Sequence, residues 1–285
     1  MLKAYVELTK PERTFANVIT AFAGYLFASK WHFHWTVFVA LIIGSTLIIA
    51  SACVFNNYTD QSMDRKMKRT KHRVLVAGNI SVRAALIFAT GLGVLGFVAL
   101  AYTNWLTFGI GWLAFVSYVV FYDLAKRYSV FSTLIGTIPG AASLVAGYTA
   151  VSGHLDYLAL LLFIIMVCWQ MAHFYAIAIY RVKDYKQAKL PIWSVTYGIP
   201  STKRQIYLFI AAFILANALL GIGYNPFLYS YIVVMGVVGG YWLYRAAKGF
   251  EVRTDDTQWA RGIFSLSLVV LLVFAGMLSI APLLT

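Results

Sequence analysis

Three oxygen-bearing side chains follow one another at four-residue intervals early in the chain: Asn56, Asp60 and Asp64. If this segment is helical, steps of about 100° per residue place all three within about 80° of one another. Oxygen ligands on one face suit Mg²⁺, which takes one or two protein carboxylates and fills its shell with water and substrate phosphates. The motif alone predicts equally well a magnesium site or a solvated helix end at a membrane surface.

Six cations occupy residues 65–73, directly after these ligands. Arg69 and Arg73 would grip one phosphate group together if their segment is helical. Any single cation here is better explained by contact with anionic lipid headgroups. A diphosphate with a bound metal ion requires carboxylates to hold the metal and guanidiniums to bind the phosphates. The combined pattern therefore predicts a diphosphate substrate at the membrane surface.

Two further segments carry polar side chains at helical spacing. Tyr122 and Lys126 share a helix face and could offer a hydroxyl and an ammonium to one oxyanion, although such pairs more often mark a membrane boundary. Relative to Trp169, the residues His173, Tyr180 and Asp184 fall within about 60°, on one stripe. A stripe facing only lipid would not be built from these residue types.

His173 stands out because an ionisable residue inside an apolar span costs about 2.5–3.5 kcal/mol on insertion scales. Such a residue is a functional candidate by default. Either an interhelical hydrogen bond or contact with a substrate would explain it.

The composition indicates which elements must position these side chains. Of the 285 residues, 61% are hydrophobic and only 12% are charged, whereas soluble domains carry about 25% charged residues. This excludes a secreted disulfide scaffold, a disordered chain and a cytosolic Rossmann or barrel enzyme. Cys53 and Cys168 lie in or beside apolar runs, so we expect small core residues rather than a disulfide.

Nine apolar segments are long enough to cross a hydrocarbon core, which needs about 20 residues. We therefore expect an all-α polytopic bundle of about nine transmembrane helices, forming a single integral membrane domain over residues 1–285. The predicted spans are 14–30, 36–55, 82–102, 105–123, 131–151, 157–180, 205–223, 227–244 and 262–282.

The distribution of charge predicts the orientation of the bundle. Of the 23 lysines and arginines, all but Lys30 fall in segments on one side of the predicted spans, and of the ten acids all but Asp156 do so. The positive-inside rule then places the N-terminus in the cytoplasm and the C-terminus outside. The net charge of +13 is thus an orientation signal, and no nucleic-acid partner is expected. The long loops after spans two and six place the chemistry on the cytoplasmic face.

The chain resembles the intramembrane prenyltransferases of the UbiA type over nearly its whole length. Such proteins have nine helices, an Asn-x-x-x-Asp-x-x-x-Asp motif after helix two and a second acidic motif after helix six. The matching positions are Asn56, Asp60, Asp64, Arg69-Thr70, Arg73, Tyr122-x-x-x-Lys126 and Asp184.

Further matches, from Cys53 to Tyr58 and in the stretch Tyr180-Arg181-x-Lys183-Asp184-Tyr185, are similar to the branch that farnesylates haem. Two positions depart from the general pattern. Ala188 stands where many members have a second carboxylate, a feature of the haem branch that argues against a hydroxybenzoate or naphthoate acceptor. Ala172 stands where the haem branch usually has proline before the histidine.

The resemblance implies that haem B, farnesyl diphosphate and water give haem O and diphosphate. It implies metal ligation by Asn56, Asp60 and Asp64, with Asp184 holding a second metal, and a catalytic role for Asp60, Asp64 and Lys126. Diphosphate would be bound by Arg69, Arg73, Tyr122 and Lys126. Haem contacts would come from His173, Trp169 and Tyr180, with His173 either ligating iron or contacting a propionate.

Two alternatives remain open from the sequence. One is prenylation of another acceptor, such as a quinone precursor, and the other is a transporter of haem or a phosphorylated metabolite. Transporters often show matched halves with broken helices at the midplane, whereas here the polar residues gather at one face. Because no presequence precedes the first span, we expect a bacterial plasma membrane. The expected partners are the bilayer, the two substrates and proteins of haem maturation or terminal-oxidase assembly.

Overall fold

The computed structural model describes residues 2–67, 69–225, 229–251 and 255–284, and these residues form helices and connecting loops without a strand. Lys68 and Arg253, which contribute to the predicted charge asymmetry, lie outside the described residues.

The helices follow one another along the chain in a simple order. They are α1 (Leu2–Leu8), α2 (Pro11–Ser29), α3 (Trp35–Thr59), α4 (Gln61–Asp64), α5 (Val82–Ala101), α6 (Trp105–Val116), the π-helical segment η1 (Ser117–Tyr122), α7 (Asp123–Tyr128), α8 (Ser132–Ser152), α9 (Tyr157–Tyr180), α10 (Val182–Gln187), α11 (Trp193–Thr196), α12 (Gly198–Tyr224), α13 (Tyr229–Ala247), the 3₁₀ turn η2 (Lys248–Phe250), α14 (Asp256–Ile280) and the 3₁₀ turn η3 (Ala281–Leu283).

A long helix lies at each predicted span. Within the described residues, seven helices are long and apolar enough to cross a membrane, so the chain is a multi-pass membrane protein. These seven do not include α2 and α13, and the count of nine crossings therefore stays a prediction. The boundaries shift most at α12, which begins at Gly198 rather than at residue 205, and at α14, which begins at Asp256 rather than at residue 262.

Side-chain caps fix where several of the long helices begin, α5, α6 and α9 among them. Ser81, Asn104 and Asp156 precede α5, α6 and α9, and each accepts a hydrogen bond from the backbone N–H three residues on, at 2.8–3.2 Å. Such oxygens satisfy amide groups that have no partner inside the helix. These polar residues therefore set the starts of apolar segments whose periodicity alone leaves the boundary open.

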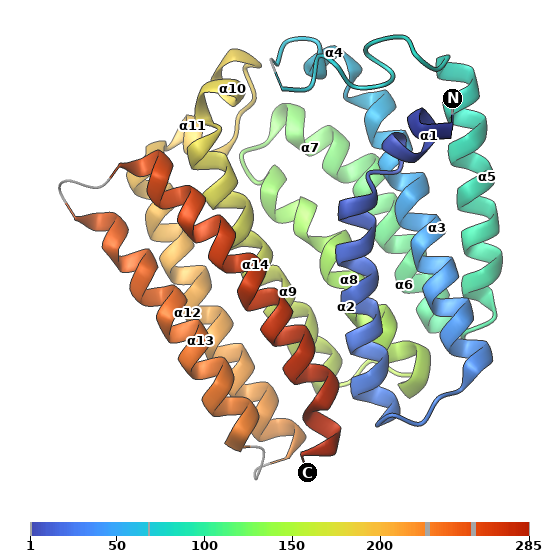
Figure 1. Cartoon of the computed structure of the whole chain (residues 1–285), viewed down its shortest axis with the longest axis vertical. Coiled ribbons are helices and arrows are strands. Elements are labelled where there is room, and N and C mark those ends of the chain that lie inside the picture. The colour runs from blue at the N-terminus through green and yellow to red at the C-terminus, as the bar shows by residue number, and fades with distance from the viewer. Residues whose placement is uncertain (1, 68, 226–228, 252–254, 285) are drawn as a thin grey trace.

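The long helices form a bundle that closes on itself. Neighbours in sequence pack side by side, α3 with α5, α8 with α9, α9 with α12 and α12 with α13, while α14 contacts both α9 and α2. Figure 1 shows the short helices α4, α10 and α11 at one end of this bundle, the end at which α1 also lies.

Glycines allow α2 and α8 to approach each other closely. A Cβ atom on Gly24 would collide with the carbonyl oxygen of Leu144, and one on Gly147 would collide with the carbonyl oxygen of Ala21. Small residues at such crossings are typical of helix packing in membranes. The contact holds α2, which follows Lys10, against the centre of the bundle.

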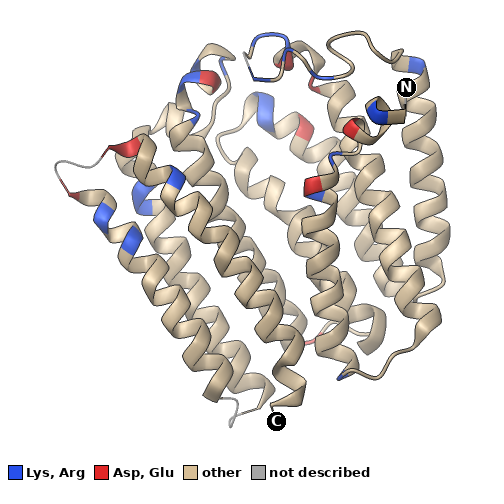
Figure 2. Ribbon diagram, in the orientation of Figure 1, with Lys and Arg blue, Asp and Glu red and all other residues tan. Residues whose placement is uncertain are grey.

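The largest buried cluster joins α9, α12, α13 and α14 and includes Phe213, Trp242 and Phe274. Cys53 and Cys168 are free and buried, as predicted. Most of the charged residues lie toward the end of the bundle that holds α4 and α10, as the coloured ribbon of Figure 2 shows. The predicted one-sided charge distribution is therefore present in the described residues, and the site must be sought at this end.

Candidate active site

The predicted oxygen ligands lie on successive helical turns at the charged end. Helix α3 ends at Thr59 and α4 begins at Gln61, so the continuous helix expected through residue 64 is interrupted. The helical hydrogen bonds nevertheless persist, because the Asp60 N–H donates to the Asn56 carbonyl at 3.0 Å and the Asp64 N–H to the Asp60 carbonyl at 2.8 Å. The four-residue spacing therefore repeats as one helical turn across the junction.

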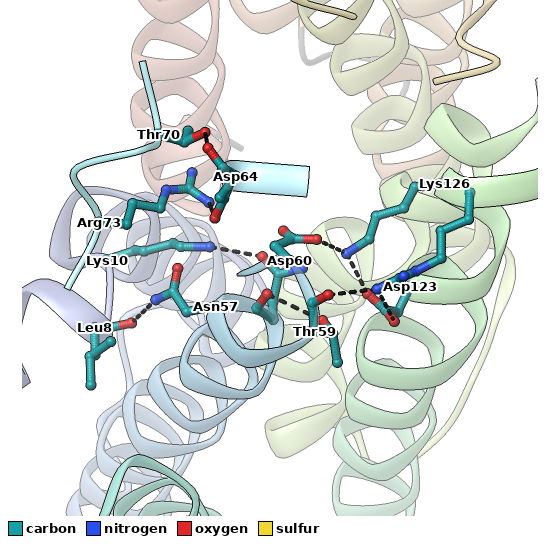
Figure 3. Close-up of polar contacts among 12 residues, drawn as sticks. Leu8, Lys10, Asn57, Thr59, Asp60, Asp64, Thr70, Arg73, Asp123 and Lys126 are labelled. Atoms are coloured by element: carbon teal, nitrogen blue, oxygen red, sulfur yellow. Dashed lines mark hydrogen bonds and ion pairs between the residues drawn. The ribbon is translucent and has the colours of Figure 1, made fainter. Parts of the chain in front are cut away.

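Each of these three side chains has a cationic partner from a different part of the chain (Figure 3). The lysine before α2 donates to the amide oxygen at 2.8 Å, a lysine on α7 forms an ion pair with the first carboxylate, and an arginine from the loop after α4 contacts the second carboxylate at 2.6 Å. The pairs are Lys10–Asn56, Lys126–Asp60 and Arg73–Asp64. Each of the three predicted oxygen ligands is thus paired with a cation in one partly buried region.

Lys126 joins two carboxylates. Its ammonium forms ion pairs with both Asp60 and Asp123, and the Lys126 and Asp123 residues are only 7% and 9% exposed. Arg127 lies 3.8 Å from the Asp123 carboxylate and donates to the Thr59 carbonyl at 2.5 Å. These contacts fasten α7 to the end of α3.

The ring of Tyr122 forms one wall beside this lysine. The Lys126 ammonium lies 5.5 Å from the ring centroid, so the two residues share a face through a cation–π contact. Tyr118 stacks on Tyr122 with ring centroids 5.4 Å apart, and its hydroxyl lies 3.4 Å from the Asn56 amide oxygen. Both tyrosines lie in the π-helical segment η1, a type of irregularity that is frequent at functional sites.

The described residues of the basic loop after α4 form no helix, which corrects the geometry assumed for Arg69 and Arg73. The segment is a series of turns, and Thr70, 1% exposed, fastens it by donating to the Asp64 carbonyl at 3.1 Å. Burial lowers the pKa of Arg69, and the positive charges of Arg181 and Arg73 lower this pKa further. Guanidiniums that repel one another in this way favour a bound anion.

Asp184 lies in the second long loop, which packs against the first. Met63 and Met67 form a small buried cluster with Ala188, with Leu190 packed against it. Among the described residues, Asp184 forms no ion pair or side-chain hydrogen bond, and the structure does not bring it into contact with the other predicted ligands.

The predicted stripe on α9 packs against α14. His173 stacks on Trp169 with ring centroids 4.9 Å apart, and its Nδ1 lies 2.7 Å from the Ser267 hydroxyl. Tyr180 packs edge-on against Phe264, with centroids 5.8 Å apart. An interhelical hydrogen bond was one of the two explanations that the sequence offered for His173, and this bond is present.

Sequence reasoning missed Lys10, Asp123, Arg127 and Ser267. The Asp123-x-x-Lys126 spacing is a helical ion-pair signal that could have identified Asp123. Lys10 and Ser267 gave no signal, because each meets its partner across a large sequence separation.

The donor set can be tested for its fit to a divalent cation. Within the described residues, no group of three or more His, Cys, Asp or Glu side chains is placed to hold a metal. The candidate set instead combines one amide with two carboxylates, which matches the oxygen-only preference of Mg²⁺ and its need for substrate phosphates. A bound Mg²⁺ would replace Lys126 and Arg73 at the carboxylates.

Comparison with known proteins places this chain in a family. The model of the UbiA prenyltransferase family matches residues 17–281. Proteins named "Protoheme IX farnesyltransferase" from Klebsiella pneumoniae and Pseudomonas syringae are each 45% identical over 282 residues, covering 98% of this chain and 95% of the relative. A UbiA homologue from Archaeoglobus fulgidus, solved with GPP and Mg²⁺, has the same fold, with a TM-score of 0.75 at 14% identity over 97% of this chain and 99% of that one. The chain belongs to the UbiA prenyltransferase family.

Proposed function

We propose that this prenyltransferase joins the farnesyl group of farnesyl diphosphate to a vinyl group of haem B, giving haem O. The names of relatives 45% identical over nearly the whole chain support this acceptor. The observation that carries the proposal is the set of three oxygen ligands at the charged end of the bundle, each of which is paired with a cation. A leaving diphosphate bridged by a metal needs both kinds of group.

Asn56, Asp60 and Asp64 are the proposed magnesium ligands, and Asp184 is proposed to hold a second metal. When bound, Mg²⁺ stabilises the negative charge that develops on the departing diphosphate. The complex of a fold relative with Mg²⁺ and GPP is consistent with this use of the fold.

The cations of the chain would change partners when the substrate binds. Lys126 and Arg73 now neutralise the two carboxylates. Once released from the carboxylates, Lys126 and Arg73 would bind diphosphate together with Arg69 and the hydroxyl of Tyr122. Preorganised donors aimed at the developing charge lower the barrier, because they need little reorganisation during the reaction.

The bond changes balance as follows. The allylic C–O bond of farnesyl diphosphate breaks and its electrons leave with diphosphate. The π electrons of the haem vinyl group form the new C–C bond, and water captures the resulting carbocation and loses a proton.

The site's acidic and basic residues gather at one end of an apolar bundle, so the farnesyl tail would lie between the spans. His173, Trp169 and Tyr180 are the proposed haem contacts.

We further propose a single domain over residues 1–285 in a bacterial plasma membrane, with the charged end facing the cytoplasm. This orientation rests on the one-sided distribution of lysine and arginine. Proteins of haem maturation or terminal-oxidase assembly are the proposed recipients of the product.

The test is incubation of the purified protein in lipid nanodiscs with Mg²⁺, farnesyl diphosphate and haem B, followed by mass analysis of the pigment. We expect haem O with the wild type and none after chelation of Mg²⁺. Asp60→Ala should abolish transfer, while Glu7→Ala, an exposed carboxylate at the same end, should not. Unchanged haem with the wild type would contradict the proposal and favour another acceptor or a transporter.

A further inference from the structure

A chain of hydrogen bonds crosses from α9 to α14 at Ser267. The Ser267 hydroxyl lies 2.6 Å from the Phe264 carbonyl oxygen and 2.7 Å from His173 Nδ1. The backbone carbonyl of Ser267 accepts the indole N–H of Trp169 at 2.8 Å. Ser267 is fully buried, and His173 is 8% exposed. Two side chains of the predicted stripe are thus tied to one residue of α14.

These distances decide the tautomer of His173. A carbonyl oxygen only accepts, so the short contact to Phe264 requires the single hydroxyl proton of Ser267. The hydroxyl must then accept from the imidazole, which places the ring proton on Nδ1. Nε2 has no hydrogen-bond partner among the described residues and keeps its lone pair. A neutral imidazole held in this way is the form that ligates a metal.

Aromatic rings and a cation continue from His173 toward the charged end. Phe264 lies 4.8 Å from the imidazole, Tyr180 packs against Phe264, and the Arg261 guanidinium lies over the Tyr180 ring at 5.9 Å. Arg261 is exposed and has no carboxylate partner among the described residues. From His173 toward the charged end, the seam between α9 and α14 therefore holds a ring nitrogen with a lone pair, two aromatic rings and a cation that has no carboxylate partner among the described residues.

We propose that the seam of α9 and α14 binds the iron porphyrin, with His173 Nε2 on the iron, Ser267 fixing the tautomer and Arg261 binding a propionate. This assignment rests on the proposed function. Arg261 lies six residues before Ser267, about 9 Å nearer the charged end along α14. The iron then lies deeper in the bundle and the propionate edge faces the aqueous side. Ser267 is a positioning residue, because it acts through His173.

The tautomer can be measured without haem or activity. The protein has five histidines, and ¹⁵N-histidine NMR of the wild type, with His173→Gln used to assign the signal, reports which ring nitrogen carries the proton. We expect a protonated Nδ1 and an unprotonated Nε2 for His173. The opposite tautomer would overturn the role of Ser267.

Haem binding tests the iron contact. Ferric haem is titrated into nanodiscs of zwitterionic lipid, and the Soret band and the iron–histidine stretch of the reduced form are recorded. His173→Ala should remove the histidine signature. Ser267→Ala should weaken binding by about 10–100-fold, the usual cost of losing a partner of a metal-bound histidine, and should lower the stretching frequency. Ser267→Thr should restore both.

The matched control is Ser279→Ala, since Ser279 also donates to a carbonyl one turn back on α14, at 2.7 Å from Ala275 O. It should leave the haem spectrum unchanged. A wild-type spectrum in His173→Ala would overturn the site.

Esterified haem tests Arg261 and separates a propionate from a lipid headgroup. Arg261→Gln should weaken binding of haem about tenfold and leave binding of its dimethyl ester unchanged. Equal weakening of both ligands would overturn the propionate contact. If the wild type forms haem O but the His173, Ser267 and Arg261 variants bind haem normally, this inference is wrong and the proposed function still stands. If the wild type neither binds nor farnesylates haem, the proposed function fails.

Discussion

At the scale of single residues, Lys126 holds the site together. Its one ammonium neutralises Asp60 and Asp123, which come from different helices. Asp60 Oδ1, Asp123 Oδ1 and Lys126 Nζ are buried and have no further hydrogen-bond partner. A buried charge without a counter-charge is strongly unfavourable. Lys126 therefore neutralises both carboxylates in the structure, and the proposed function gives it a second role, binding the leaving diphosphate.

We predict that Lys126→Met lowers kcat for farnesyl transfer by about 10²–10³-fold, the range found when one preorganised donor to a developing negative charge is lost. Steady-state kinetics in nanodiscs would measure the change. Lys186→Met, which removes an exposed lysine of α10, is the control. A Lys126→Met enzyme with unchanged kcat would contradict the diphosphate role.

The sequence predicted Asn56, Asp60 and Asp64 because their spacing is local and a helical turn repeats it. Lys10 could not be predicted, since its bond to Asn56 spans 46 residues and depends on how α2 packs against α3. Tyr122 and Lys126 were predicted to share a helix face, and the Lys126 ammonium does lie over the Tyr122 ring; the role of the Tyr122 hydroxyl stays a prediction.

At the scale of elements, the crossing of α2 and α8 sets where the α2 end of the site lies. Gly24 and Gly147 meet the backbone of the opposite helix. Overfilling a packed contact costs about 1–3 kcal/mol, which exceeds the gain of about 1 kcal/mol that alanine gives over glycine in a helix.

We therefore predict that Gly147→Ala lowers the thermal unfolding temperature. Gly240→Ala in α13, where a new Cβ meets nothing within 4 Å, should leave the temperature unchanged or raise it. Thermal unfolding of both variants in the same detergent provides the comparison. Equal behaviour would show that the close approach is not needed.

Asp156 stabilises the start of α9 at the opposite end of the bundle. Burial raises the pKa of its carboxyl, but hydrogen bonds from the Tyr148 hydroxyl at 2.6 Å and the Ala159 N–H outweigh this and leave the pKa below its ordinary value. A carboxyl whose pKa is lowered in the folded state stabilises above its unfolded pKa, and this contribution is lost as pH falls through the folded value.

We predict that Asp156→Ala costs about 0.5–2 kcal/mol at pH 7, the usual value of an N-cap, and that Asp156→Asn costs less because asparagine also caps. The advantage of the wild type over Asp156→Asn should shrink as pH falls from 7 to below the lowered pKa. Thermal unfolding across this pH range would measure it. A constant difference would contradict the ionised cap.

The elements themselves were predictable from apolar runs, but their irregularities were not. The π-helical segment η1 depends on how Tyr118 and Tyr122 pack, and Gly136 of α8 makes room for the Tyr122 ring. The helix considered for the loop after α4 does not form in the described residues, which make turns instead, and the buried Thr70 hydroxyl holds these turns against the Asp64 carbonyl.

At the scale of the whole molecule, charge and fold agree on one end of the bundle. The activity was predicted from the resemblance to the family, and the orientation in the membrane was predicted from the distribution of lysine and arginine. The closure of α14 against α2 joins helices from the two ends of the chain, and no local pattern in the sequence predicts that contact.

We predict that an impermeant maleimide labels Leu155→Cys in intact spheroplasts, whereas Lys186→Cys reacts only after the membrane is permeabilised. Both positions are exposed, and the native Cys53 and Cys168 are buried. Mass spectrometry of the labelled protein gives the pattern. The reverse labelling pattern would show that the charged end faces the outside and would contradict the predicted orientation.

Met63 and Met67, at and after α4, pack against Ala188 and Leu190, after α10, in one small apolar cluster between the two long loops. Fully burying one such side chain contributes about 1.5–3 kcal/mol, so this cluster is a minor part of the buried apolar core. Under the proposed function, opening this cluster would let the water-soluble diphosphate leave into the aqueous phase at the charged end. The apolar haem product would instead move sideways into the lipid, so the two products would leave by separate routes.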